Sequence, residues 1–268
     1  MAALGFLGMM VDPRYGGVMD TVSYVLAMQE ISKIDASAGV IMSVNNSLVC
    51  WGIEKYGTEF QKEKYLTRLA SGEILGAFCL SEPEADSDAT SQKTTARDKG
   101  EYYLLNGTKN WMTNGGSASV YLVIAQSDLE KEYKGINVFI VDGGSEGFQE
   151  GKKENKLGIW ASDTHSLMFT DVKIPKENRV GEEGSGFRFA METLAGGRIG
   201  IASQALGIAS GAYALSLQYS KERKSFGKEI VKHQAIVFKL ADMATEIEVA
   251  RLLCLKSAYD KDTVTSCD

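Results

Sequence analysis

The stretch Ala77-Phe78-Cys79-Leu80-Ser81-Glu82-Pro83-Glu84-Ala85-Asp86-Ser87-Asp88-Ala89 marks the point where this chain changes from helical to strand patterns. An apolar run that begins at Ile74 ends there in a polar loop, which Pro83 stiffens because its ring fixes φ. Four carboxylates and two hydroxyls lie in this loop. Loops on a rigid scaffold often carry binding groups, although an acidic loop taken alone is more often a solvated turn.

The residues before this loop show helical patterns. Asp20 or Thr21 can cap a first helix in which apolar residues recur three or four apart. A segment rich in small residues follows at 36–56. Thr58-Glu59-Phe60-Gln61 is a capping-box pattern that opens a third helix reaching about Ala70. The N-terminal third of the chain is therefore predicted to be helical.

The residues after the loop show strand patterns. Asn106-Gly107 lies between 102–105 and 108–112 and is a strong signal for a two-residue hairpin. Further short strands, separated by turns rich in Gly and Lys, are expected at 120–125, 136–141 and 166–169. This part of the chain is predicted to be a small antiparallel β domain.

Helical patterns return after Gly184. A long helix rich in Ala and Gly is expected at 187–220, followed by a basic loop at 222–228 and a second amphipathic helix around 236–254. The order α, β, α predicts an α+β fold. Its expected domains are a helical domain at 1–73, a β domain at 74–184 and a helical domain at 185–268.

Composition narrows the function classes. The net charge is −6 with both signs mixed along the chain, which disfavours nucleic-acid binding. The four cysteines have no metal-binding spacing, so no zinc site is expected, and their dispersal suits a reducing cytosol. They are Cys50, Cys79, Cys254 and Cys267.

The apolar segments do not favour export or a membrane span. The N-terminus lacks the basic residues of a signal peptide. The apolar stretch 199–217 contains Gln204 and several glycines, which favours a buried bundle helix over a transmembrane helix.

Two places carry groups that suit a cofactor. Trp111 and Thr113 are two apart in a strand and point the same way, so they can cover a flat heteroaromatic ring and hydrogen-bond one of its nitrogens. An aromatic residue beside a cross-strand Thr is the commoner interpretation of such a pair. The basic residues of 223–228 suit a pyrophosphate, yet they equally fit a solvated turn.

The combination of motifs resembles the acyl-CoA dehydrogenase family, most closely its short-chain (butyryl-CoA) branch. The resemblance covers the chain nearly end to end, in order and with matching spacings. It rests on Cys79-Leu80-Ser81-Glu82-Pro83-Glu84-Ala85-Asp86-Ser87-Asp88, Trp111-Met112-Thr113-Asn114, Gly196-Gly197-Arg198-Ile199-Gly200-Ile201-Ala202, Glu222-Arg223-Lys224-Ser225-Phe226-Gly227 and His233-Gln234-Ala235.

The resemblance implies an FAD site between the β domain and the C-terminal helices, with the cofactor carrying the redox chemistry. Trp111 would shield one face of the isoalloxazine, and Thr113 would hydrogen-bond near its N5. Arg223 and Gln234 would reach the FAD of a neighbouring subunit, which implies a homotetramer. The FAD contacts implied by motif position are Phe78, Cys79, Leu80, Ser81, Ser87, Trp111, Met112, Thr113, Arg223, Phe226 and Gln234.

The resemblance also implies a substrate and a reaction. Ser87, Ser162, Ala195 and Arg198 match positions that hold acyl-CoA. The implied reaction removes an α-proton and a β-hydride from an acyl-CoA to give the trans-2-enoyl-CoA. Electrons would pass to an electron-transferring flavoprotein, and the enzyme is expected to be cytoplasmic, with no bound metal and no membrane or nucleic-acid partner.

The chain departs from the family pattern at several positions. Asp86 stands where the family usually has Gly, which is expected to cost conformational freedom and to place a negative charge near the cofactor. Trp160-Ala161 replace the usual Arg-Gly before Ser162. Ala195 replaces an acidic residue common in the short-chain branch.

The resemblance further implies that the chain is truncated at both ends relative to the family. The catalytic Glu, in a Glu-Gly-Thr loop, would lie beyond Asp268, and Gly197 occupies the alternative position of the base. No residue of this sequence is therefore assigned as the general base. Two hypotheses stand: an FAD-dependent dehydrogenase of which this chain is a part, and a non-catalytic remnant that keeps the fold with at most weak FAD or acyl-CoA binding.

Overall fold

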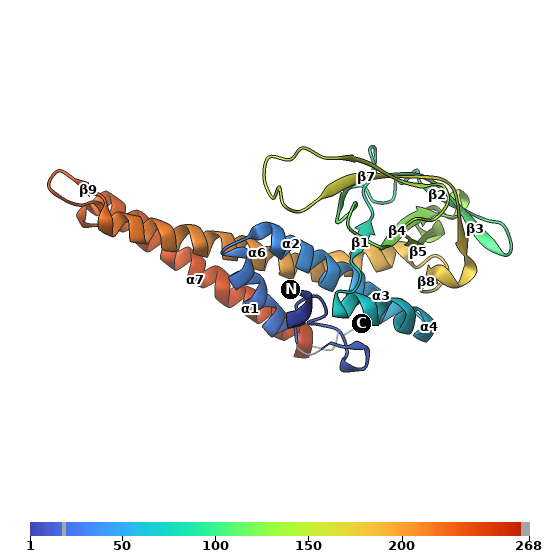
Figure 1. The fold of residues 1–268 in the computed structure, drawn as a ribbon, viewed down its shortest axis with the longest axis horizontal. Coiled ribbons are helices and arrows are strands. Elements are labelled where there is room, and N and C mark those ends of the chain that lie inside the picture. Colours follow the sequence, from blue (N-terminus) through green and yellow to red (C-terminus); the bar gives the residue numbers. More distant parts are fainter. Residues whose placement is uncertain (18–19, 264–268) are drawn as a thin grey trace. The chain divides into compact units, whose positions relative to one another are not determined.

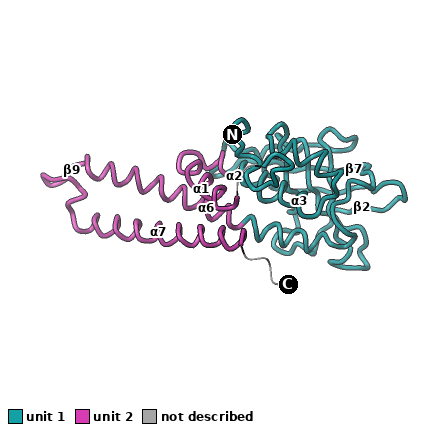
Figure 2. Tube along the Cα trace, turned by 90° about the horizontal axis from the view of Figure 1, so that it is seen from below, with its two compact units in different colours: residues 1–19, 41–197 teal, residues 20–40, 198–268 magenta. Residues whose placement is uncertain are grey.

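The computed structural model describes residues 1–17 and 20–263. Internal contacts divide the chain into two compact units, 1–19 with 41–197 and 20–40 with 198–268 (Figure 2). Cys50, Cys79 and Cys254 are buried free thiols, and Cys267 lies outside the described residues.

Short helical segments occupy the chain before the sheet (Figure 1). The predicted capping box is confirmed, because Thr58 Oγ1 accepts from Gln61 N at 3.3 Å and Gln61 Oε1 accepts from Thr58 N at 3.0 Å. The helix that begins there ends at Gly72, whose φ of 72° is left-handed. Besides α1, the segments are 3₁₀ turns Ala2–Leu4 and Pro13–Tyr15, α2 Ala36–Ser43, π-helical Val44–Cys50, α3 Trp51–Tyr56, α4 Glu59–Gln61, π-helical Lys62–Leu66 and α5 Thr67–Ser71.

Two buried asparagines in the π-helical segment Val44–Cys50 hold the neighbouring chain in place. Asn45 Nδ2 donates to Leu7 O and Leu69 O at 2.9 and 3.1 Å, and Asn45 Oδ1 accepts from the Gly76 amide at 3.1 Å. Asn46 Oδ1 accepts from the Met9 amide at 2.8 Å. Because both amides are fully used inside the protein, they fix where the N-terminal segment and the first strand lie.

A single sheet forms the other part of the first unit. In the described chain its order is β6-β7-β3-β2-β4-β5-β8, with β1 paired to β4. Most pairs are antiparallel as predicted, while β1 and β2 each pair with β4 in parallel. The strands are β1 Gly76–Cys79, β2 Thr95–Asp98, β3 Tyr102–Thr113, β4 Val120–Gln126, β5 Ile136–Asp142, β6 Phe148–Lys153, β7 Thr164–Pro175 and β8 Arg179–Val180.

The predicted hairpin at Asn106-Gly107 is wrong. Strand β3 runs through both residues and pairs with β7, with a register shift between Leu105 and Gly107. The φ of Gly107 is 149°, and a Cβ at this residue would lie 2.4 Å from Thr94 Oγ1. Glycine therefore serves a close backbone approach beside an irregularity in the strand pairing, not a turn.

An apolar core lies within the sheet and a second cluster links it to a helix of the same unit. Tyr121, Val123, Phe139 and Leu167 are fully buried among other side chains of the sheet. Phe189, at the start of α6 (Gly186–Glu222), is fully buried, stacks on Phe78 at 6.5 Å between ring centroids and packs against Tyr56 at 5.0 Å. These contacts fix β1 against α3 and the first turns of α6.

The second unit is built from helices and one small hairpin. Asp20 caps α1 by accepting from the Ser23 amide at 2.6 Å. Small residues of α6 allow close packing, since a Cβ on Gly207 would lie 2.5 Å from Gln29 O. The elements are α1 Thr21–Ser32, α6 Gly186–Glu222, of which residues 198 onward belong here, β9 Lys224–Ser225, β10 Lys228–Glu229 and α7 Gln234–Thr263.

Two helices of the described chain are long and apolar enough to span a membrane by length and composition alone. In Ala36–Tyr56, 67% of the apolar window is buried, and in Gly186–Glu222 33% is buried. Core helices of soluble proteins meet the same criteria, so this observation is weak evidence for a membrane span.

Candidate functional site

Three segments predicted to bind the cofactor and substrate meet at the end of β3 in the first unit. The Asn110 amide donates to Ser81 O at 2.9 Å, which joins β3 to the loop after β1. The Asn114 amide donates to Asp163 O at 3.1 Å, and its side chain donates to Gly76 O at 3.1 Å. Residues 76–82, 109–114 and 162–165 are therefore held together by hydrogen bonds, although they are far apart in sequence.

The residues at the end of β1 turn their side chains into the protein. Phe78, Cys79 and Leu80 are 9%, 0% and 8% exposed, respectively. Burial raises the pKa of the Cys79 thiol to about 12, so this thiol is unreactive at neutral pH. A ligand beside this segment therefore meets mainly its backbone, which suits the predicted contacts of Phe78, Cys79 and Leu80.

The polar loop after β1 is ordered by its own side chains. Ser81 Oγ donates to Asp86 Oδ1 at 2.5 Å, and Ser87 is exposed. Asp86 is not among the described non-glycine residues with positive φ. The conformational cost that we expected at Asp86 is therefore wrong, because the local backbone does not need glycine; the added negative charge remains.

Sequence reasoning missed two residues beneath this loop. The side chain of Glu82 is turned inward and pairs with Lys109 Nζ at 2.8 Å, where the two side chains are 2% and 0% exposed. The burial of Lys109 could have been predicted from the sequence, because alternation along β3 places it on the same inward face as Tyr103 and Leu105. A lysine on an inward-facing strand position requires a buried partner.

The end of β3 is irregular at the predicted flavin-shielding residue. The pairing with β7 shifts between Lys109 and Met112, and Trp111 has a φ of 65°. The Trp111 ring is 59% exposed, Met112 is buried and Thr113 is half-buried. A bulge re-aims side chains, so the simple alternation on which we paired Trp111 with Thr113 does not hold through this segment.

Ser162 is fully buried, and its Oγ has no hydrogen-bond partner within the described residues. Lys156 Nζ donates to Ser162 O at 2.5 Å and to Thr164 Oγ1 at 2.7 Å, and burial lowers the pKa of Lys156. The indole of Trp160 donates to Lys156 O at 2.6 Å and is 72% exposed. Sequence reasoning missed Lys156, which orders the turn that carries Ser162.

The remaining predicted residues lie on α6 and at the turn between α6 and α7. Ala195 belongs to the first unit and is exposed, whereas Arg198 is exposed in the second unit. Arg223, Phe226 and Gln234 are exposed around the small β9–β10 hairpin of the second unit, and Phe226 is 94% exposed. The predicted contacts therefore fall in both units, with one group around β3 in the first and another at this turn in the second.

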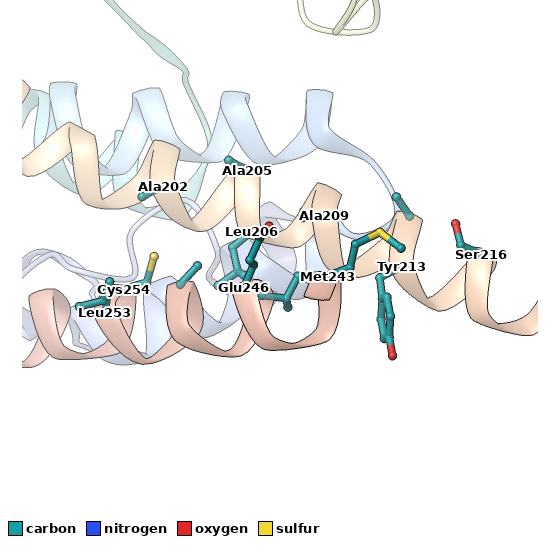
Figure 3. Close-up of a pocket in the computed structure, with 13 residues that line it drawn as sticks. Ala202, Ala205, Leu206, Ala209, Tyr213, Ser216, Met243, Glu246, Leu253 and Cys254 are labelled. Atoms are coloured by element: carbon teal, nitrogen blue, oxygen red, sulfur yellow. The ribbon is translucent and has the colours of Figure 1, made fainter. Parts of the chain in front are cut away.

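An apolar groove of about 620 Å³ lies between α6 and α7 within the second unit (Figure 3). Leu206, Met243, Ile247 and Cys254 line it with several alanines, and Glu246 is its one charged lining residue. The groove contains none of the predicted site residues. No group of three or more His, Cys, Asp or Glu side chains suited to a metal ion occurs in residues 1–17 and 20–263.

Comparison with known proteins gives the same family in all three parts of the chain. The N-terminal, middle and C-terminal domain models of acyl-CoA dehydrogenases match residues 1–73, 77–172 and 184–267, respectively. The short-chain specific acyl-CoA dehydrogenase of Megasphaera elsdenii is 49% identical over 267 residues, covering 97% of this chain and 70% of that protein.

Solved structures agree in fold. Butyryl-CoA dehydrogenase from Megasphaera elsdenii matches with a TM-score of 0.95 at 49% identity, over 97% of this chain and 69% of the other. A chain from a structure of the electron transferring flavoprotein of Acidaminococcus fermentans matches with a TM-score of 0.96 at 50% identity, over 97% and 69%. A glutaryl-CoA dehydrogenase from Mycobacterium smegmatis, in complex with FADH2, matches with a TM-score of 0.92 at 35% identity, over 98% and 66%.

Proposed function

Since the chain belongs to the acyl-CoA dehydrogenase family, we propose that it serves FAD-dependent α,β-dehydrogenation of a short-chain acyl-CoA to the trans-2-enoyl-CoA. The observation that carries the proposal is the meeting of residues 76–82, 109–114 and 162–165 at the end of β3. The first segment contains the start of one motif by which the sequence resembles the family, 79–88, the second contains another, 111–114, and the third contains the proposed substrate residue Ser162. The chain spans about 70% of the length of the M. elsdenii relative.

The described residues fit FAD at this place. Trp111 is 59% exposed and Thr113 is half-buried in the same irregular segment at the end of β3, so this segment offers an exposed aromatic side chain and a hydroxyl group. We assign Phe78, Cys79, Leu80 and Ser81 to contact the cofactor through their backbone, with Ser87, Met112, Arg223, Phe226 and Gln234 as further contacts. When bound, FAD supplies the acceptor for the β-hydride.

The same region suits the acyl-CoA. The Oγ of the buried Ser162 has no hydrogen-bond partner within the described residues, and because buried polar groups ordinarily have one, this supports a role for Ser162 in binding. We propose that Ser162 positions the acyl-CoA together with Ser87, Ala195 and Arg198. Among residues 1–268 we assign no general base.

Further partners follow from the relatives. We propose that electrons pass to an electron-transferring flavoprotein, because a chain similar to this one occurs in a structure of such a protein. We further propose a homotetramer in which Arg223 and Gln234 reach the FAD of a neighbouring subunit. We also propose that the protein is cytoplasmic and that its domains are residues 1–73, 74–184 and 185–268.

The test is the visible absorbance spectrum of the purified protein with FAD, before and after anaerobic addition of butyryl-CoA. A flavin spectrum that bleaches supports the dehydrogenase. A flavin spectrum that stays unchanged supports the alternative of a remnant that binds FAD without turnover. Absence of any bound flavin contradicts the FAD assignment itself.

A further inference from the structure

We infer that the buried ion pair Lys109–Glu82 is a positioning pair that holds the loop after β1 and the end of β3 in one fixed arrangement. This inference rests on the proposed function, in which both segments face the flavin in this arrangement. Neither residue is expected to touch the cofactor. Their effect is on where Ser81 and Trp111 lie.

The ammonium group of Lys109 is used completely inside the protein. Its Nζ donates to Glu82 Oε1 at 2.8 Å, to Leu80 O at 2.9 Å and to Gln92 Oε1 at 3.1 Å. An ammonium group has three hydrogens, so each has one acceptor. The side chain is fully buried, and the three acceptors come from the end of β1, from the loop and from the residues before β2.

The carboxylate of Glu82 extends the same network. Besides Lys109, it accepts from the Lys93 amide at 2.6 Å and from the Thr94 amide at 3.1 and 3.2 Å. The two ends of the segment 80–94 are thereby tied to each other, because Glu82 binds the amides of Lys93 and Thr94 while Lys109 binds both Glu82 and Leu80 O. Burial raises the pKa of Glu82, but Lys109 and the backbone donors outweigh burial and hold it below the usual value.

The pair acts on β3 through register. Lys109 is the last residue before the shift in the pairing of β3 with β7, and Trp111 follows it with a left-handed backbone. The neighbouring Asn110 amide donates to Ser81 O at 2.9 Å. A slip of β3 by one residue would take the ammonium away from all three acceptors and leave two buried charges unpaired, which is strongly unfavourable.

A buried ion pair is a poor way to gain stability, since apolar residues of similar volume often do as well or better. In this protein the role of the fully buried and fully bonded pair is therefore to fix one geometry, not to add stability. Here the fixed geometry lies at the meeting point of the two segments that carry the proposed flavin contacts.

The experiment compares Lys109→Met, Glu82→Gln and the double variant with the unchanged protein. Lys131→Met is the matched control, because it also removes one positive charge but from an exposed ion pair of the same unit. Hydrogen exchange is followed at the Lys93, Thr94 and Asn110 amides, with β4 and β5 as internal reference. FAD affinity is measured by titration of flavin fluorescence.

We expect Lys109→Met to speed exchange at these amides about tenfold or more, a factor equivalent to about 1.4 kcal/mol, with β4 and β5 unchanged. The FAD dissociation constant should rise by a similar factor, and Lys131→Met should change neither quantity. If Lys109→Met does not fold, both measurements are made on the double variant, in which neither position 82 nor position 109 has a buried charge.

Unchanged exchange at these amides overturns the inference, as does faster exchange with unchanged FAD affinity. If the unchanged protein binds no FAD, the proposed function fails instead. The exchange result alone then decides whether Lys109 and Glu82 position these segments.

Discussion

Glu192 is expected to make the stability of the first unit depend on acid pH. It lies in the first turns of α6, where its carboxylate accepts from Lys55 Nζ at 2.6 Å, from Arg188 Nε at 2.8 Å and from the Tyr56 hydroxyl. Although burial raises its pKa, Lys55, Tyr56 and Arg188 together lower the pKa of Glu192 from 4.5 to about 2. The perturbation is Glu192→Gln.

The size of the effect follows from this shift. A folded pKa below the unfolded one gives stability that is present above pH 4.5 and is lost as the pH falls toward 2. At about 1.4 kcal/mol per pH unit, the carboxylate contributes up to about 3 kcal/mol at pH 7. Roughly half of that contribution should remain at pH 3.

The assay is urea unfolding at pH 7 and pH 3 for the unchanged protein and for Glu192→Gln. The difference in unfolding free energy between the two proteins should be largest at pH 7 and should shrink toward pH 3. Glu183→Gln is the control, because Glu183 is 62% exposed and its ion pairs with Lys131 and Arg179 are 3.4 Å long, so it should change stability by less than about 1 kcal/mol. A difference for Glu192→Gln that is the same at both pH values would refute the reasoning.

Three further predictions concern packing, thiol reactivity and the substrate loop. Gly52→Ala should destabilise the protein by about 1–3 kcal/mol in urea unfolding, because the new Cβ would lie 2.5 Å from Phe189 Cζ; an unchanged midpoint would mean that Phe189 moves freely. Burial raises the pKa of the Cys50 and Cys79 thiols, so iodoacetamide should label both only after denaturation. Mass spectrometry of the treated protein measures the labelling, and labelling of these thiols in the folded protein would contradict their burial. Trp160→Ala should change stability by less than about 0.5 kcal/mol but weaken butyryl-CoA binding about tenfold in calorimetry, because it frees the turn before Ser162; equal affinity would separate Trp160 from the substrate site.

Helices were predictable from the sequence because their signals are local. The capping box of Thr58 and Gln61 and the apolar periodicity after Ile236 each lie within a few residues, and the structure has helices at both places. Strand pairing is not local. Gly107 has the same sequence neighbours in a hairpin turn as in a continuous strand, and only its pairing with β7 and its approach to Thr94 distinguish the two.

The candidate site residues that belong to a sequence motif were predictable. The residues whose role depends on a partner far away in the sequence were not. The loop after β1 and the run after Lys109 were both singled out from their residues and given roles by the resemblance, and a backbone hydrogen bond joins them. Glu82 and Lys109 are 27 residues apart, so neither looks like half of an ion pair in the sequence. Lys156 was missed for the same reason, because its acceptors become neighbours only when the turn has formed.

The backbone conformation of Trp111 implies a trade-off at that position between thermal stability and flavin binding. A bulky residue with a φ of 65° is strained, at a cost of order 1–3 kcal/mol that glycine or asparagine would largely avoid. Selection for thermal robustness alone would therefore replace this tryptophan, and the replacement would remove the exposed ring proposed to cover the flavin. In a directed-evolution experiment, heat-resistant variants that change Trp111 should be the ones that lose flavin.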